Sequence, residues 1–206
     1  MKTIYNIQGW NLVKVSTIAV MSLLTLILIF HGINEQSMAI AIRLTARTSC
    51  ILFLLAFCAS SLRRFKSNKF TRWLLQNRRY FGLSMAVSHG FHAIAIIGAA
   101  ILSTETIPTD NHGGNLGYLF IIAMTITSFR YPASFLGDRG WQILHTVGMY
   151  YLWLAFIYSF SNRLDESLLI YLPFVSLLII AIALRCLVRV FNQKSILKHE
   201  LPQRRD

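Results

Sequence analysis

The sequence predicts an all-α membrane protein, a single polytopic bundle of six transmembrane helices with both termini in the cytoplasm. Two observations lead to this prediction. First, 55% of the 206 residues are hydrophobic and only 14% are charged, and the apolar residues form long uninterrupted blocks. Second, the basic residues gather in alternate connections between these blocks. No linker or low-complexity tract divides residues 1–206, so we expect one domain.

Six apolar blocks approach the roughly 20 residues that are needed to cross a hydrocarbon core of about 30 Å. They cover residues 13–30, 44–62, 80–102, 116–129, 141–160 and 168–190. The fourth block is the weakest, and it becomes long enough only if it extends from Asn115 to Tyr131. The first block could instead be a signal peptide, but it is long and lies far from the Ala-Ile-Ala triplet downstream, so we expect it to remain as a helix.

The distribution of charge sets the predicted orientation. With a cytoplasmic N-terminus, 17 of the 20 Lys and Arg residues lie on the cytoplasmic side, and five of the eight acidic residues lie on the other side. The three remaining basic residues are Arg43, Arg47 and Arg163, and the first two are long enough to reach headgroups from the end of the second block. This asymmetry predicts a multi-pass protein of the inner (plasma) membrane.

The segment between the second and third blocks, "RRFKSNKFTRWLLQNRR", is strongly basic. A segment of this kind can bind nucleic acid, but beside a bilayer its charge is explained by topology and by contact with anionic lipid. We therefore expect membrane lipid as a partner and no nucleic acid. The three cysteines lie inside predicted spans without CxxC spacing, so we expect neither a disulfide framework nor a thiolate metal site.

Three histidines lie inside the predicted spans, where an imidazole is costly and therefore a candidate for function. His89 and His92 share one face of the third block, and His145 lies in the fifth block, one turn from Gly148. Imidazole nitrogens bind haem iron, and a glycine lets a flat macrocycle approach a helix. The alternative is that these histidines form hydrogen bonds between helices, as polar groups in membrane bundles often do.

Other chemistries have less support in the sequence. Two histidines at i, i+3 without acidic or cysteine residues at matching depth do not make a zinc site. The spans contain no carboxylates for a proton relay and show no broken helix pairs of the transporter type. There is no GxGxxG or Walker A sequence and no soluble segment for a flavin or NAD site. Any redox chemistry would therefore need a separate reductase or other electron donor.

Four segments in order resemble the ferric reductase-like transmembrane domain family: "RLTARTSCILFLLAF", "RRYFGLSMAVSHGFH", "YLFIIAMTITSF" and "FLGDRGWQILHTVGMYYLW". The resemblance covers about residues 40–160. Its most specific parts are RR-x-x-G-L, followed by His92 ten residues after Gly82, and L-G-x-x-x-W-x-x-L-H, which ends at His145. Relatives in this family include the haem-binding membrane subunit of the periplasmic methionine sulfoxide reductase system, iron reductases and NADPH oxidases.

The resemblance implies an oxidoreductase subunit that relays electrons through one b-type haem between the third and fifth helices. By position, His92 and His145 match histidines that bind the haem iron in the family, so the resemblance implies them as axial ligands, with His89 as the rival of His92. Tyr158 occupies a position where relatives commonly carry a further histidine. The family pattern therefore does not supply two full bis-histidine haems.

The depths of the implied ligands differ. At a rise of about 1.5 Å per residue, His92 lies roughly 20 Å from Arg79, whereas His145 lies only about 6 Å from Trp141. His89 lies one turn nearer to the level of His145, and Met149 is a further candidate axial group. The competing interpretation is a non-catalytic membrane protein that keeps the fold without cofactor and acts as an assembly or interaction subunit.

Overall fold

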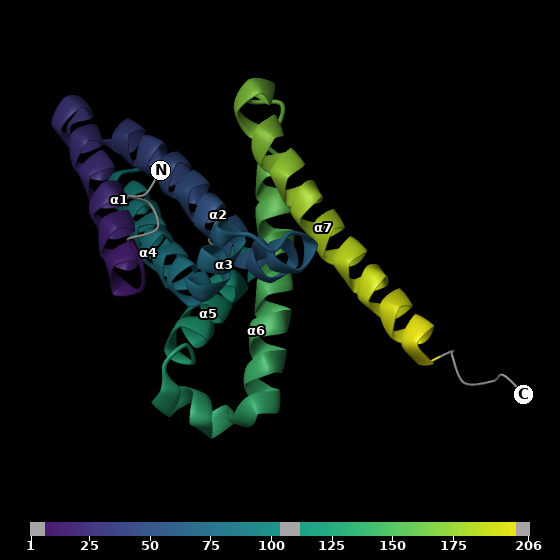
Figure 1. Cartoon of the computed structure of the whole chain (residues 1–206). Coiled ribbons are helices and arrows are strands. Elements are labelled where there is room, and N and C mark those ends of the chain that lie inside the picture. The colour runs from purple at the N-terminus through teal and green to yellow at the C-terminus, as the bar shows by residue number, and fades with distance from the viewer. Residues whose placement is uncertain (1–6, 104–111, 201–206) are drawn as a thin grey trace, which may run out of the picture.

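The computed structural model describes residues 7–103 and 112–200, and within them it contains only helices and the connections between them. The predicted all-α class is therefore confirmed (Figure 1). The helices are α1 (Trp10–His31), α2 (Glu35–Phe65), α3 (Lys69–Gln76), α4 (Arg78–Leu102), α5 (His112–Ile126), α6 (Arg130–Ser161) and α7 (Leu168–Glu200).

Five helices are long and apolar enough to cross a membrane. They are α1, α2, α4, the part of α6 over Ala133–Ser161 and the part of α7 over Leu168–Phe191. Helix α5 has 15 residues, which span about 22 Å, less than the roughly 30 Å of a hydrocarbon core. Large side chains such as Ile29, Ile101 and Leu169 are 69%, 77% and 89% exposed, as expected for helices that face lipid. These five helices support the predicted membrane protein. Helix α5 corresponds to the fourth predicted span, and it is too short to count as a crossing by its length alone.

Helix α2 begins nine residues before the apolar block that predicted it. Asn34 caps the helix: its side chain accepts a hydrogen bond from the Ser37 amide at 2.9 Å, and the Ser37 hydroxyl accepts one from the Asn34 amide at 3.1 Å. This reciprocal capping box satisfies two amides that the first turn would leave unpaired. Capping thus extends α2 through a polar stretch that hydrophobicity did not mark.

Helix α3 was not predicted, because it lies inside the basic connection. It carries the same type of capping box, in which the Asn68 side chain accepts from the Thr71 amide at 2.8 Å and Thr71 accepts from the Asn68 amide at 3.1 Å. Its residues Trp73 and Leu74 are buried, and the Trp73 indole donates a hydrogen bond to the Ile7 carbonyl at 3.1 Å. The basic connection therefore contains a short helix, and Trp73 of this helix binds the backbone of Ile7 near the N-terminus.

Gly137 divides α6 into two parts. Its φ of 64° lies in the left-handed region, which glycine adopts without the steric cost that other residues meet. The first part of α6 turns away from the second at this point, at the lower end of the molecule in Figure 1. The longer part, which carries His145, then runs upward as a membrane-length helix.

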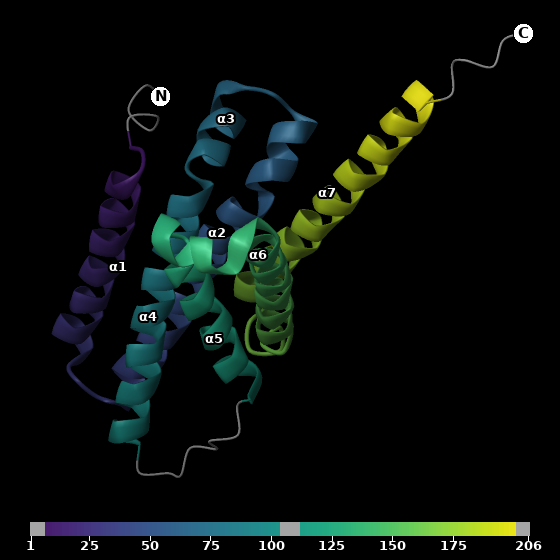
Figure 2. The same ribbon diagram turned by 90° about the horizontal axis from the view of Figure 1, so that it is seen from below.

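Helix α2 is the centre of the bundle, and it packs along α4 over most of its length. Small hydroxyl side chains line this contact: Ser88 lies 2.8 Å from Thr48 and 3.0 Å from Ser49, measured between side-chain oxygens. Such residues let two helices approach closely in a membrane. Helix α7 diverges from the others toward its C-terminal end, which Figure 2 shows clearly. The predicted histidines therefore lie on α4 and α6, on two sides of a core built around α2.

Candidate functional site

His92 lies on α4 and faces α2. Its Nδ1 lies 3.1 Å from the Ile42 carbonyl oxygen and 3.0 Å from the Thr45 hydroxyl, which itself donates to the Ala41 carbonyl at 2.7 Å. Because a carbonyl oxygen only accepts hydrogen bonds, Nδ1 of the neutral ring carries the proton. The electron pair of the imidazole is then on Nε2. This arrangement is typical of a histidine that binds a metal, whose other ring nitrogen donates to a carbonyl.

His89 lies one turn earlier on α4 and contacts three aromatic rings. Its ring centroid lies 4.9 Å from that of His92, 5.0 Å from Tyr118 on α5 and 6.1 Å from Phe156 on α6. Nδ1 of His89 and the hydroxyl of Tyr118 are both buried without a hydrogen-bond partner among the described residues. A buried polar atom without a partner costs about 1–3 kcal/mol. A polar group that formed a hydrogen bond with His89 Nδ1 or with the Tyr118 hydroxyl would therefore stabilise the contact between α4, α5 and α6.

His145 connects α6 to α5. Its Nε2 lies 3.1 Å from the Thr127 hydroxyl, and its ring stacks on Trp141 with centroids 4.3 Å apart. The Trp141 indole donates to the Thr127 carbonyl at 2.9 Å, and the Thr127 hydroxyl donates to the Ala123 carbonyl at 2.7 Å. That hydroxyl can then accept the proton of His145 Nε2. The three side chains form one hydrogen-bonded unit that joins two helices.

The structure does not bring His145 to the level of the other two histidines. His145 lies 11 residues before Phe156 on α6, and Phe156 is the α6 residue whose ring contacts His89. Eleven residues of helix correspond to about 16 Å. Two axial ligands must bind one iron from its two faces, so His145 does not pair with His92 or His89 in this arrangement. Of the three histidines, His92 alone has an imidazole oriented as a metal ligand, and the structure does not assemble the pair with His145 that the resemblance implies.

Gly148 packs against α5. A Cβ atom at this position would lie 2.7 Å from Met124 Sδ and 3.2 Å from Phe120 Cδ1. From the sequence, we expect Gly148 to let a macrocycle approach α6. In the structure, the side chains of Met124 and Phe120 on α5 occupy that place.

Gly148→Ala should destabilise the protein by about 1 kcal/mol, because Met124 and Phe120 must shift to admit the methyl group. The matched control is Gly90→Ala in α4, where nothing lies within 4 Å of the added atom. That change should leave the stability unchanged or raise it by up to about 1 kcal/mol through helix propensity. Thermal unfolding of the detergent-purified variants measures both effects, and equal midpoints would refute the close packing of α5 on α6.

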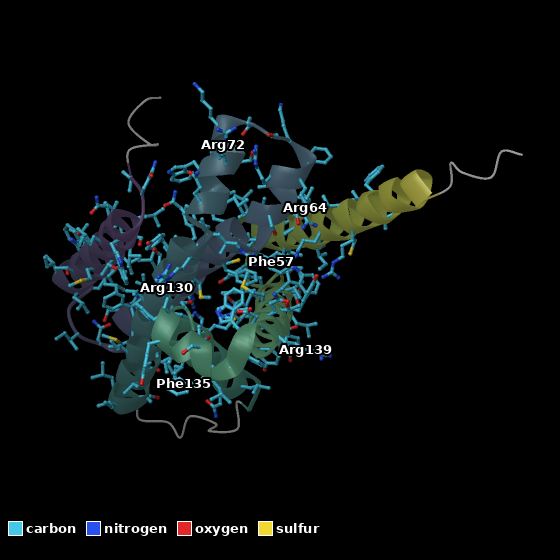
Figure 3. The ribbon with its side chains drawn as sticks, turned by 60° about the horizontal axis from the view of Figure 1, so that its bottom comes forward. Phe57, Arg64, Arg72, Arg130, Phe135 and Arg139 are labelled. Atoms are coloured by element: carbon cyan, nitrogen blue, oxygen red, sulfur yellow. The ribbon has the colours of Figure 1, made fainter. Side chains whose placement is uncertain are left out.

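Two half-buried arginines, Arg78 and Arg185, pack against residues of the core. The Arg185 guanidinium lies 4.1 Å from the ring centroid of Phe57 and 5.0 Å from that of Tyr150, and its Nη1 is buried without a partner among the described residues. Arg78 Nε donates to the Ala56 carbonyl at 3.1 Å. Arg185 lies inside the apolar block 168–190, and this position was the signal in the sequence for a packed charge. Figure 3, which brings the bottom of the molecule forward, labels Arg64, Arg72, Arg130 and Arg139 at positions around the centre of the view, where Phe57 is labelled.

Among the described residues, the three histidines adjoin neither a metal-binding cluster nor either of two surface cavities. The described residues contain no group of three or more His, Cys, Asp or Glu side chains that could hold a metal ion. One surface cavity of about 460 Å³ is lined by α1, and another of about 510 Å³ lies between α1 and α2. Neither cavity includes His89, His92 or His145.

The histidines thus offer one imidazole that is oriented as a metal ligand, one with an unpaired nitrogen, and one that joins two helices. No family model, curated protein or solved structure matches this chain.

Proposed function

We propose that this chain is a membrane-embedded haem protein of the ferric reductase-like class, which binds one b-type haem through His92 and relays electrons from a separate donor. The observation that carries the proposal is the hydrogen bond of His92 Nδ1 to the Ile42 carbonyl, which leaves Nε2 available for iron. The unpaired atoms of His89 and Tyr118 lie beside it and add support. The order of motifs along residues 40–160 supplies the class.

A bound haem would supply one-electron chemistry, and the chain would hold and shield it. His92 would bind the iron, while Ile42 and Thr45 fix the ring orientation and tautomer. The rings of Tyr118 and Phe156 on the facing helices would exclude water from this level of the bundle. The absorption spectrum of the purified protein tests the proposal, because haem gives a Soret band that shifts on reduction.

We further propose that α5 completes a sixth span, so that both ends of the chain lie in the cytoplasm. The arginines labelled in Figure 3 support the cytoplasmic assignment of the segments that carry them. An even number of spans also keeps the basic α2–α3 connection and the basic tail on one side.

Cysteine labelling tests this topology, using Ser67→Cys between α2 and α3 and Asp165→Cys between α6 and α7 in a cysteine-free background. Both positions are exposed, and between them lie the helices α4, α5 and α6 and the eight-residue α3, which is too short to cross. A membrane-impermeant maleimide should label Asp165→Cys in intact cells and Ser67→Cys only after the membrane is opened. Labelling of both from the same side would show that α5 does not cross, and the reverse pattern would invert the orientation.

A second candidate function is a non-catalytic assembly or interaction subunit. The observation that favours it is that helix packing accounts for the polar contacts of His145 and for the glycine at 148. A colourless protein that is folded and that fails to take up added haem would support this candidate and contradict the haem proposal.

A further inference from the structure

A groove of about 510 Å³ runs between α1 and α2, on a part of the molecule that the haem proposal does not use. Its walls follow one face of each helix at spacings of three and four residues, which is the spacing of neighbours on a helix surface. The lining residues are Leu23, Leu26, Ile27, Phe30 and His31 from α1, Ile40, Arg43, Leu44 and Arg47 from α2, and Ile170 from α7.

The groove combines apolar walls with basic side chains. Arg43 and Arg47 lie one turn apart on α2, where two like charges repel each other. The Arg47 guanidinium lies 5.3 Å from the ring centroid of Tyr171, and its Nη2 lies 3.4 Å from the Tyr171 hydroxyl, a long and weak hydrogen bond. Its Nε is buried without a partner among the described residues.

Among the described residues, no carboxylate pairs directly with Arg43 or Arg47. The Glu166 carboxylate reaches Arg47 only through the Tyr171 hydroxyl, which donates to Glu166 Oε2 at 3.4 Å. Among the described residues, the only ion pair within 4.0 Å joins Arg163 to Glu166 at 3.6 Å, and it includes neither arginine of the groove. Charged groups in membrane segments are costly unless they meet a partner. An anion from outside the chain would therefore stabilise this end of α2.

We propose that the groove binds an anionic glycerophospholipid. Its phosphate would lie at Arg43 and Arg47, which donate the charge-assisted hydrogen bonds that guanidinium groups form with phosphate. An acyl chain would lie along the apolar wall of α1, at Leu23 and Leu26, which are 42% and 48% exposed in the chain alone. A free phosphate ion would satisfy the arginines but leave this wall uncovered.

Such a lipid would join α1 to the bundle. Few residues of α1 and α2 contact each other directly compared with the long contact of α2 with α4, and the groove occupies the space between them. A lipid that bridges the two helices binds only the folded arrangement, so it should raise the unfolding temperature by mass action.

Native mass spectrometry of the full chain in detergent tests the proposal, with phosphatidylglycerol and phosphatidylcholine of identical acyl chains as probes. The wild type should retain phosphatidylglycerol about tenfold more than phosphatidylcholine, and Arg43→Gln/Arg47→Gln should lose that preference. The matched control is Arg130→Gln/Arg139→Gln, two exposed arginines on α6 that lie outside the groove and outside the basic segment between α2 and α4, and it should keep the preference. Leu26→Trp, which fills the groove without changing its charge, should also reduce retention.

Each arm has an outcome that overturns the proposal. Equal retention of the two lipids by the wild type would remove the anion preference, and full retention by Leu26→Trp would remove the groove as the site. If Arg43→Gln/Arg47→Gln does not fold, Leu26→Trp and the wild type still decide the result. Inorganic phosphate should not raise the unfolding temperature as the lipid does, and an equal rise would identify a phosphate site rather than a lipid site. These readouts do not depend on haem.

Discussion

Replacing His92 with alanine should lower the haem absorbance per chain at least about tenfold, because the change removes the proposed iron ligand itself. Loss of an outer hydrogen-bond partner alone typically weakens metal binding by about 10- to 100-fold, and loss of a ligand should cost at least as much. The measurement is the Soret absorbance of the purified variant relative to its protein concentration, after expression in haem-replete cells.

Alanine variants at the other two histidines are the matched controls. His145→Ala should keep the absorbance, since His145 bonds to Thr127 and stacks on Trp141 about three turns away. His89→Ala should also keep most of it, because its nitrogen lacks the carbonyl partner that orients His92. Loss of absorbance in His145→Ala with retention in His92→Ala would transfer the ligand role to His145 and refute the site described above.

Phe53→Ala should lower the free energy of unfolding by about 3 kcal/mol, the largest stability effect we expect from a single truncation in the bundle. Phe53 is fully buried, and its ring centroid lies 5.2 Å from those of both Phe57 and Phe156. The cavity left by the ring would open between α2 and α6, where these aromatic side chains join the two helices. Thermal or denaturant unfolding in detergent, followed by circular dichroism, measures the loss.

The matched control for that truncation is Phe65→Ala at the end of the same helix. Phe65 is 69% exposed, so its removal leaves no cavity, and the stability should change by less than about 0.5 kcal/mol. Similar losses for the two variants would contradict the central position of Phe53.

The sequence predicted those parts of the fold that depend only on the length of an apolar run. Uninterrupted apolar runs gave five helices of membrane length, but such runs do not mark helix ends. The capping pairs Asn34–Ser37 and Asn68–Thr71 extended α2 and formed α3 in polar sequence. The left-handed backbone at Gly137 was equally invisible to hydrophobicity.

The candidate site was predictable as a set of residues but not as an arrangement. The cost of burying imidazole singled out the three histidines, and counting along the helices already placed His145 at a different depth. Their partners depend on how helices pack: Thr45 for His92, Tyr118 for His89 and Thr127 for His145. Positions inside or at the end of apolar blocks marked Arg47 and Arg185 as unusual charges, but the aromatic rings that face them depend on how the helices pack.

The pyridine haemochrome of the purified full-length chain tests the central claim most directly, because it reports haem type and haem content together. We expect the spectrum of haem b with one haem per chain, in protein that is folded and monodisperse. Folded protein that contains no haem, and that takes up none when haem is added, would contradict it.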